Sequence, residues 1–324
     1  MRKKPTILIT EGLDYSKKAI KSYESIGRLF FYENLKGEEL DIALKEAEII
    51  VIRLRHKIGS DWLEKMPNLK IVATPTTGLN HLDLLALEER GIRVVSLKGK
   101  TSFLRKITST AELTFGLLLA LIRHIPSAHA DVVSGNWNRD AWRGNQLREK
   151  TFGIVGLGRL GVIVARYAKA FEMKVIAYDP NVSTVVMKKS GVKKVKTLAD
   201  LFKISDIVSV HVPLEKKTEK LIGDKEFAVA KAGLLLINTS RGEVIDEEAL
   251  FQALKNNKIG GAAIDVMTNE SADGKHLKNN KLLDYAKNNN NLIIVPHIGG
   301  ASFEAMHITE EFIAEEVSLV SKKR

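Results

Sequence analysis

Short runs of apolar residues alternate with helix-like stretches along most of the chain. The runs are rich in Ile, Val and Leu, and the stretches between them repeat apolar positions at helical spacing. This alternation predicts an α/β fold in which parallel, doubly wound sheets are joined by crossover helices. The expected strands cover residues 6–10, 48–53, 70–75, 92–97, 152–158, 174–179, 206–213, 233–240, 261–265 and 291–296.

The order of these elements repeats once. Residues 47–92 and 205–259 each contain an apolar strand, a helix, a second strand, a Thr-containing loop with Gly, and a helix carrying acids. The repetition predicts two related α/β units. A helix expected at 108–124 is apolar on most sides, so we expect it to be packed on more than one side.

Composition is compatible with two folded domains. The chain has 324 residues, of which 44% are hydrophobic and 27% charged. No apolar run reaches the roughly 18 residues needed to span a bilayer, and the N-terminal segment lacks a small-residue cleavage site, so we expect a cytoplasmic protein without membrane contact. With 0 cysteines, disulfides and thiolate-based nucleophiles or metal sites are excluded, and we expect no metal.

The net charge of +11 raises the possibility of a nucleic-acid partner. The basic residues are scattered, and many lie beside Asn in loops, which is typical of a solvated surface. We therefore expect no nucleic-acid partner.

A glycine-rich loop provides a specific functional motif. Gly156, Gly158 and Gly161 lie between an apolar strand and an apolar-periodic helix, and Asp179 closes the next strand, 18 residues after Gly161. In such a loop the glycines allow a tight turn, close approach of a pyrophosphate and close helix packing, while the acid binds a ribose hydroxyl. The pattern predicts NAD as cofactor. Asp179 would repel a 2′-phosphate, which favours NAD over NADP.

Arg241 lies just after the apolar strand that contains residues 234–237. A guanidinium near a buried strand end is costly unless an anion meets it, and it binds carboxylates in a bidentate manner. We therefore expect Arg241 to bind a substrate carboxylate.

Two further residues, Glu270 and His297, follow predicted strands. A histidine can pass a proton to or from an alcohol oxygen, and a carboxylate on its other nitrogen fixes the tautomer. His211 also ends a strand and is a rival for the proton-transfer role, although its neighbours Val212 and Pro213 are more typical of a wall beside the cofactor.

These motifs, taken together, make the chain resemble the D-isomer-specific 2-hydroxyacid dehydrogenases, the family of phosphoglycerate dehydrogenases, hydroxypyruvate reductases and D-lactate dehydrogenases. The matching segments are TGLNHLD at 77–83, STAELTFGLLLALIR at 109–123, GNW at 135–137, GIVGLGRLG at 153–161, HVPL at 211–214, INTSRGEVIDEEAL at 237–250, AAIDV at 262–266 and PHIGGAS at 296–302. The resemblance implies that Arg241, Glu270 and His297 are the catalytic residues, and it favours His297 over His211. The chain departs from the family pattern at Ser271, because the family usually has proline directly after the glutamate.

The resemblance also implies the organisation of the chain and further binding residues. A Rossmann NAD-binding domain, residues 102–296, would be inserted into a flavodoxin-like substrate domain, residues 1–101 and 297–324, and the protein would be a homodimer built through the region of the crossing helix at 108–124. Substrate contacts would come from Arg53, Thr77 and Gly78. The implied cofactor contacts are Gly156, Gly158, Arg159, Leu160, Gly161, Asp179, His211, Val212, Pro213, Thr239, Ser240, Asp265 and Gly300.

The expected activity is hydride transfer between NAD(H) and C2 of a D-2-hydroxy acid or 2-oxo acid. The substrate remains open among 3-phosphoglycerate, hydroxypyruvate, glyoxylate, lactate and a sugar-derived acid. A non-catalytic NAD-sensing or scaffold protein on the same fold is the alternative, but binding alone does not need an acid–base pair.

Overall fold

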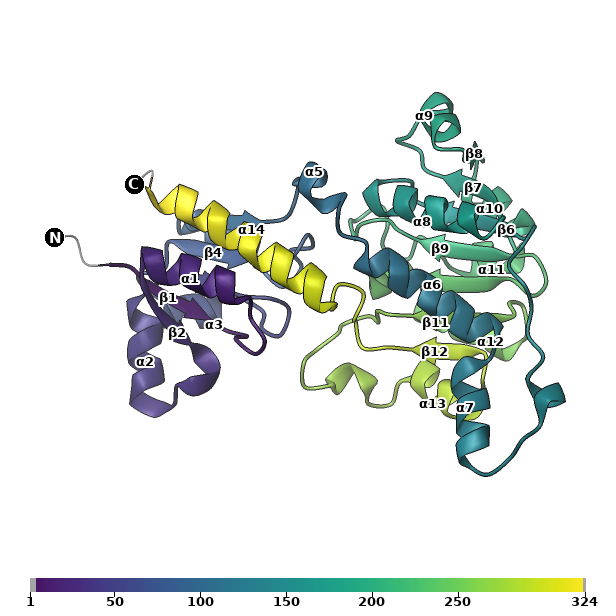
Figure 1. Cartoon of the computed structure of the whole chain (residues 1–324), viewed down its shortest axis with the longest axis horizontal. Coiled ribbons are helices and arrows are strands. Elements are labelled where there is room, and N and C mark those ends of the chain that lie inside the picture. The colour runs from purple at the N-terminus through teal and green to yellow at the C-terminus, as the bar shows by residue number, and fades with distance from the viewer. Residues whose placement is uncertain (1–3, 323–324) are drawn as a thin grey trace. The chain divides into compact units, whose positions relative to one another are not determined.

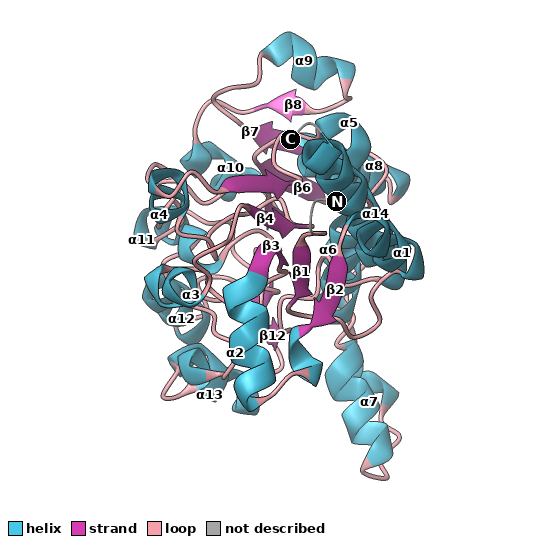
Figure 2. Ribbon diagram, turned by 90° about the vertical axis from the view of Figure 1, so that its left-hand side faces the viewer, coloured by secondary structure: helices cyan, strands magenta, loops and turns pink. Residues whose placement is uncertain are grey.

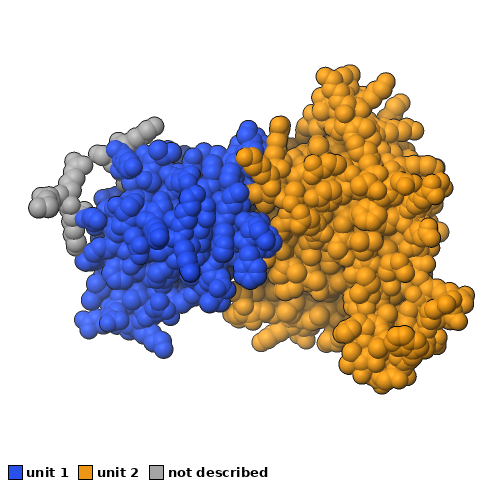
Figure 3. Space-filling view, in the orientation of Figure 1, with its two compact units in different colours: residues 1–104, 302–324 blue, residues 105–301 orange. Residues whose placement is uncertain are grey.

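The computed structural model describes residues 4–322, which form two compact units (Figure 3). Unit 1 comprises Met1–Leu104 and Ser302–Arg324, and unit 2 comprises Arg105–Ala301. Unit 2 is therefore inserted, in sequence, between the two segments of unit 1.

Unit 1 is built on a parallel sheet with the strand order β2-β1-β3-β4-β5 in its described residues. This is the flavodoxin-like order of a doubly wound sheet. Its elements are β1 Thr6–Ile9, α1 Lys17–Ile26, β2 Arg28–Phe31, η1 Tyr32–Asn34, α2 Gly37–Glu46, β3 Ala47–Val51, α3 Ser60–Lys65, β4 Ile71–Thr74, α4 Leu84–Glu89, β5 Arg93–Ser96, α5 Thr101–Leu104 and α14 Phe303–Lys322.

Helices cover the unit 1 sheet because its strands are apolar on both faces. The residues of β1, β3 and β4 are almost all buried. On one face, buried side chains of α2, α3 and α4 pack with Leu8, Ile50 and Val72. The long helix α14 lies along α1 and contacts β4 and β5 (Figure 1).

Unit 2 contains a parallel sheet with the strand order β12-β11-β10-β9-β6-β7-β8 over its described residues. Its elements are α6 Ser109–Ile122, α7 Ile125–Val133, η2 Arg139–Trp142, β6 Thr151–Val155, α8 Arg159–Ala170, β7 Lys174–Tyr178, α9 Thr184–Lys189, β8 Lys193–Lys194, α10 Leu198–Ile204, β9 Ile207–Val210, α11 Asp224–Ala228, β10 Leu235–Asn238, η3 Gly242–Val244, α12 Glu247–Lys255, β11 Gly261–Ile264, η4 Lys275–Leu277, α13 Lys281–Asn288 and β12 Leu292–Ile294. The order of the chain reverses between β6 and β9, and open α/β sheets bind ligands at such a reversal, outside the carboxyl ends of the strands.

Alternate side chains of the unit 2 strands face two hydrophobic clusters, one on each side of the sheet. Ile154, Ile207 and Ile237 pack with α6 and α8, whereas Val208 and Leu236 pack with the helices of the other face. Figure 2 shows the strands lying between helices. The expected fold class, α/β with two doubly wound parallel sheets, is confirmed.

Helix α6 is the apolar helix expected at 108–124, and it packs against α8, β10, β11 and β12. No single helix among residues 4–322 is long and apolar enough to span a membrane, although α6 and α7 together pass that test across a bend of 59°.

All ten expected strands are present, but two others were not predicted. The strand β2 lies at an edge of the unit 1 sheet and is only partly buried. The strand β8 consists of two lysines at an edge of the unit 2 sheet. Neither has the buried apolar run on which strand prediction depends.

Candidate active site

The turn from β6 into α8 requires glycine at two positions, one in the loop and one in the first turns of the helix. Gly156 has φ +90°, and a Cβ there would lie 2.7 Å from Val212 Cγ1. A Cβ on Gly161 would lie 2.3 Å from the carbonyl oxygen of Gly156, so glycine lets α8 approach the loop. At Gly158, which caps α8, a Cβ would meet nothing within 4 Å. Space is therefore left at the helix N-terminus, where a pyrophosphate would bind.

Asp179, which follows β7, is tied to this loop. One carboxylate oxygen accepts a hydrogen bond from the amide of Leu157 at 2.9 Å, and the other accepts from the amide of Asn181 at 2.8 Å. The carboxylate is thus held beside the glycine loop. Next in the loop, Arg159 begins α8, and burial lowers the pKa of its guanidinium; Leu160 is half-buried in the same turn.

His211 follows β9 and brings Val212 and Pro213 to the glycine loop. A Cβ on Gly156 would also come within 3.0 Å of the His211 carbonyl oxygen. The His211 Nε2 atom lies 2.8 Å from the hydroxyl of Ser209, and burial lowers the pKa of His211 to about 3. Such a histidine stays neutral at physiological pH, which suits a wall of the site better than proton transfer.

The turn after β10 fixes Arg241. The side-chain oxygen of the buried Asn238 accepts hydrogen bonds from the amide and hydroxyl of Ser240 at 3.0 and 2.9 Å, and its amide donates to the carbonyl of Arg241 at 2.9 Å. The guanidinium of Arg241 donates to the Ser240 carbonyl at 2.6 Å. In the same turn, the hydroxyl of Thr239 lies 3.0 Å from that of Thr114 on α6.

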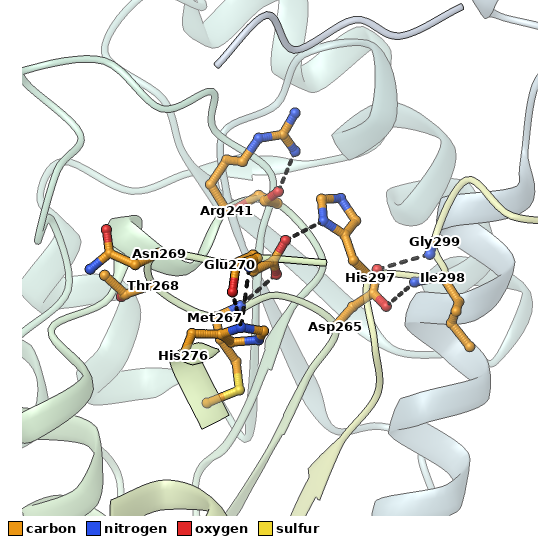
Figure 4. A network of polar contacts seen from close by, with 12 residues as sticks. Arg241, Asp265, Met267, Thr268, Asn269, Glu270, His276, His297, Ile298 and Gly299 are labelled. Atoms are coloured by element: carbon orange, nitrogen blue, oxygen red, sulfur yellow. Dashed lines mark hydrogen bonds and ion pairs between the residues drawn. The ribbon is translucent and has the colours of Figure 1, made fainter. Parts of the chain in front are cut away.

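Glu270 and His297, which are 27 residues apart in sequence, meet beside this turn (Figure 4). The distance between His297 Nδ1 and Glu270 Oε2 is 2.6 Å, and the two side chains are 28% and 31% exposed. The other oxygen of Glu270 accepts from the amide of Met267 at 2.8 Å. Because the carboxylate occupies Nδ1, the Nε2 atom is the ring nitrogen of His297 that Glu270 does not contact.

The electrostatics of the three residues are coupled. Burial raises the pKa of Glu270, but hydrogen bonds from His297 and Met267 and the charge of Arg241 outweigh it, so this pKa lies below its ordinary value. Burial lowers the pKa of Arg241, and the charges of Glu270 and Glu243 oppose that effect. At neutral pH the site therefore holds an ionised Glu270 close to a partly desolvated Arg241.

Asp265, at the end of β11, holds the backbone that carries His297. Its carboxylate accepts from the amides of Ile298 and Gly299 at 2.6 and 2.8 Å, and its carbonyl accepts from the amide of His297 at 2.8 Å. His297 has a φ of +53°, a left-handed conformation that costs about 1–3 kcal/mol in a residue other than glycine. These hydrogen bonds offset that strain. Gly300, three residues after His297, has open space where a Cβ would stand.

The loop that carries Glu270 is held by side chains that the sequence patterns did not indicate. Glu247 accepts from the amide of Thr268 at 2.6 Å, and Glu243 accepts from the amide of Asn269 at 3.3 Å. Gly242 is required beneath the loop, because a Cβ there would lie 2.0 Å from the backbone of Met267. The segment after β10 thus positions both Arg241 and the Glu270 loop.

The expected substrate contacts belong to unit 1. Arg53 follows β3, and Thr77 and Gly78 follow the neighbouring strand β4, so all three lie at the carboxyl edge of this sheet. Thr77 is exposed. The guanidinium of Arg53 pairs with the fully buried Glu310 of α14 and lies 5.1 Å from the ring centroid of Tyr15. No sequence pattern pointed to Glu310 as its partner.

The residues around the glycine loop fit a dinucleotide. The helix N-terminus at Gly158 is open, and the Asp179 carboxylate stands at the end of the adjacent strand, as binding of a pyrophosphate and a ribose requires.

Comparisons with known proteins support this interpretation. The family model described as "D-isomer specific 2-hydroxyacid dehydrogenase, NAD binding domain" matches residues 115–299. Among curated relatives, a D-3-phosphoglycerate dehydrogenase of Methanocaldococcus jannaschii is 38% identical over 97% of this chain and 57% of its own length. That of Homo sapiens is 34% identical over 98% of this chain and 57% of its own length. The chain thus spans little more than half the length of these relatives.

Solved structures are similar over nearly their whole length. A D-lactate dehydrogenase of Aquifex aeolicus, in complex with NAD and lactic acid, is 29% identical, with a TM-score of 0.81 over 98% of this chain and 96% of that chain. Residues 115–299 are accordingly an NAD-binding domain.

Proposed function

Because the chain belongs to the D-isomer-specific 2-hydroxyacid dehydrogenases, we propose that it transfers a hydride between NAD(H) and C2 of a D-2-hydroxy acid or 2-oxo acid. The observation that carries the proposal is the 2.6 Å contact between His297 and Glu270 in the loops beside Arg241. An ionised carboxylate on Nδ1 fixes the tautomer in which Nε2 exchanges a proton with substrate.

In the reducing direction the proposed roles are as follows. Arg241 binds the substrate carboxylate through its guanidinium, which orients the neighbouring carbonyl. Protonated His297 gives the proton on Nε2 to the carbonyl oxygen as negative charge develops there, while Glu270 stabilises the imidazolium. The bound NADH supplies the hydride. A cation and a proton donor directed at the oxygen stabilise the transition state more than the ground state.

In the oxidising direction His297 begins neutral, with its proton on Nδ1 shared with Glu270. The lone pair on Nε2 then accepts the proton of the substrate hydroxyl. The same Glu270 contact therefore serves both directions.

We assign NAD binding to residues 102–296 and substrate binding to residues 1–101 and 297–324. Cofactor contacts would come from the glycine loop, from Asp179, from residues 211–213, from Thr239, Ser240 and Asp265, and from Gly300. Substrate contacts would come from Arg53 and from the amides of Thr77 and Gly78. Asp179 would repel a 2′-phosphate, so NADH should be preferred to NADPH.

The experiment that tests the proposal is a panel of 2-oxo acids with NADH, followed at the nicotinamide absorbance. The panel includes 3-phosphohydroxypyruvate, hydroxypyruvate, glyoxylate and pyruvate, because the relatives act on phosphoglycerate and lactate by name. Turnover of at least one acid supports the proposal and identifies the substrate. NADH binding without turnover of any 2-oxo acid in the panel would instead favour a non-catalytic NAD-sensing or scaffold role.

We also propose that the protein is a homodimer that associates through the α6–α7 region. The side chains of Ile125, Val132, Val133 and Trp137, on and just after α7, are 52%, 46%, 73% and 88% exposed. Exposed large apolar side chains close together in the sequence support this surface as the interface. Light scattering should give a dimer mass that Val133→Glu reduces, and a monomer at every concentration would refute the proposal.

A further inference from the structure

The residue directly after Glu270 is held by a histidine. The amide of Ser271 donates a hydrogen bond to His276 Nδ1 at 3.2 Å, and the Ser271 hydroxyl lies 3.4 Å from the same atom. His276 belongs to the short helix η4 and lies beside the Glu270 loop (Figure 4). Proline, expected at position 271 from the family resemblance, has no N–H and could not make this bond.

We propose that His276 is a positioning residue for Glu270. In its neutral form it holds the Ser271 amide and so fixes the loop in which Glu270 reaches His297, and its protonation releases that hold. The predicted effect on kcat rests on the proposed function. The hydrogen bond between Ser271 and His276 is a property of the loop and does not depend on that function.

The arrangement gives His276 a defined chemical state. Nδ1 accepts only while it carries a lone pair, so the proton of the neutral ring is on Nε2. Protonation places a second N–H at Nδ1, directed at the N–H of Ser271, and the acceptor becomes a donor. Two donors facing each other repel, so the protonated ring must turn away or the loop must move.

The other acceptors of this loop are carboxylate oxygens. The amides of Met267, Thr268 and Asn269 are held by the carboxylates of Glu270, Glu247 and Glu243. A carboxylate keeps acceptor lone pairs on its oxygens, whereas the Nδ1 atom of an imidazole loses its acceptor lone pair when the ring is protonated. His276 is therefore the member of the set that holds this loop whose acceptor is lost on protonation.

The charged groups on the elements that carry and follow His276 in the chain are paired with one another. In its own turn Asp273 pairs with Lys275 at 2.7 Å, and hydrogen bonds from Lys275 and Ser271 lower the pKa of that carboxyl. On the following helix α13, Lys281 pairs with Glu248 of α12 at 2.8 Å. On the loop itself Glu270 is bonded to His297.

Two substitutions separate the hydrogen bond from the charge. His276→Asn places an amide oxygen near the position of Nδ1, so it retains an acceptor that does not titrate. His276→Leu removes the acceptor at every pH. Ser271→Pro removes the donor and should abolish dependence on position 276. His307→Asn, on α14 of unit 1, is the matched control for loss of a histidine.

The first measurement needs no activity. Proton NMR of the chain without cofactor or substrate follows the downfield Nδ1–H resonance of His297, assigned by its loss in His297→Ala. In the wild type the resonance should broaden as pH falls from 8 to 5, and in His276→Asn it should persist. An identical pH course in the wild type and His276→Asn would overturn the inference, whatever the enzyme does.

The second measurement is kcat and KM for 2-oxo acid reduction at saturating NADH from pH 5 to 8. In the wild type kcat should decrease as the pH is lowered from 8 to 5, even though the reaction requires a protonated His297. In His276→Asn and Ser271→Pro this decrease should be absent. His276→Leu should lower kcat about tenfold at pH 8, with little change in NADH affinity. The same decrease of kcat at low pH in all variants, or a wild-type kcat in His276→Leu, would contradict the inference. Failure to reduce any 2-oxo acid would count against the proposed function, while the NMR result would still decide the positioning role.

Discussion

Replacing Glu270 by glutamine tests the contact on which the proposed mechanism depends. The carboxylate uses one oxygen for the amide of Met267 and the other for His297 Nδ1. Glutamine has only one oxygen. If that oxygen keeps the Met267 amide, the NH₂ group must face Nδ1 and donate to it, which holds the imidazole in the neutral form with its proton on Nε2 and opposes the imidazolium.

The expected size of the effect follows from the geometry. A distance of 2.6 Å in a partly buried pair is at the short end for a charge-assisted hydrogen bond, and such bonds contribute about 1.5–3 kcal/mol. At about 1.4 kcal/mol for each factor of ten, their loss corresponds to a decrease in kcat of about 10- to 150-fold. Both directions should be affected, because the oxidising direction needs Nε2 without its proton.

The assay is steady-state NADH oxidation with the best 2-oxo acid of the panel, and NAD reduction with the matching hydroxy acid. NADH affinity, measured by fluorescence, should stay within about twofold of wild type, because Glu270 lies in the loop after β11 rather than in the glycine loop. Glu248→Gln is the matched control, because that side chain is exposed on α12 and pairs with Lys281. The reasoning fails if Glu270→Gln turns over within threefold of Glu248→Gln in either direction.

Three other predictions concern the cofactor and stability. Gly158→Ala should fold normally, because the added Cβ would meet no atom within 4 Å, but it should weaken NADH binding about tenfold or more in a fluorescence titration. Gly116→Ala, where the Cβ also has open space, is the control and should bind NADH like the wild type. Equal NADH affinities of the two variants would show that the pyrophosphate does not bind at Gly158. Asp179→Asn should raise kcat/KM with NADPH relative to NADH, and an unchanged ratio would refute the role of the charge. The pKa of His211 falls from its usual value near 6.5 to about 3 in the folded chain, so the unfolded chain binds more protons between these values. The unfolding free energy should therefore fall as pH decreases through this window, by up to about 1.4 kcal/mol per pH unit, and urea titrations of His211→Gln should show a shallower fall.

The fold could be predicted where burial leaves a pattern in the sequence. Strands such as β4 and β9 are buried on both faces and consist mostly of apolar residues. The edge strands β2 and β8 pair on one side only and need no such run. Their pairing depends on the neighbouring strand, so the local residues carried little information about it.

Individual site residues could be proposed, but not the contacts that position them. Arg241, Glu270 and His297 each follow a strand, and parallel strand ends meet at one edge, which is visible in the sequence. The acceptors that hold the Glu270 loop are glutamates 243 and 247, which resemble ordinary surface acids at the start of a helix. Their function depends on Gly242 letting a distant loop approach, and that is a property of the folded chain.

The most direct test of the central claim is single-turnover reduction of a 2-oxo acid by His297→Ala with bound NADH. The wild type should reduce the acid in a step that the variant performs about 10²- to 10⁴-fold more slowly, since acid–base catalysis contributes on that order. NADH affinity should be unchanged. Reduction by His297→Ala at the wild-type rate would show that His297, although bonded to Glu270, does not carry the proton.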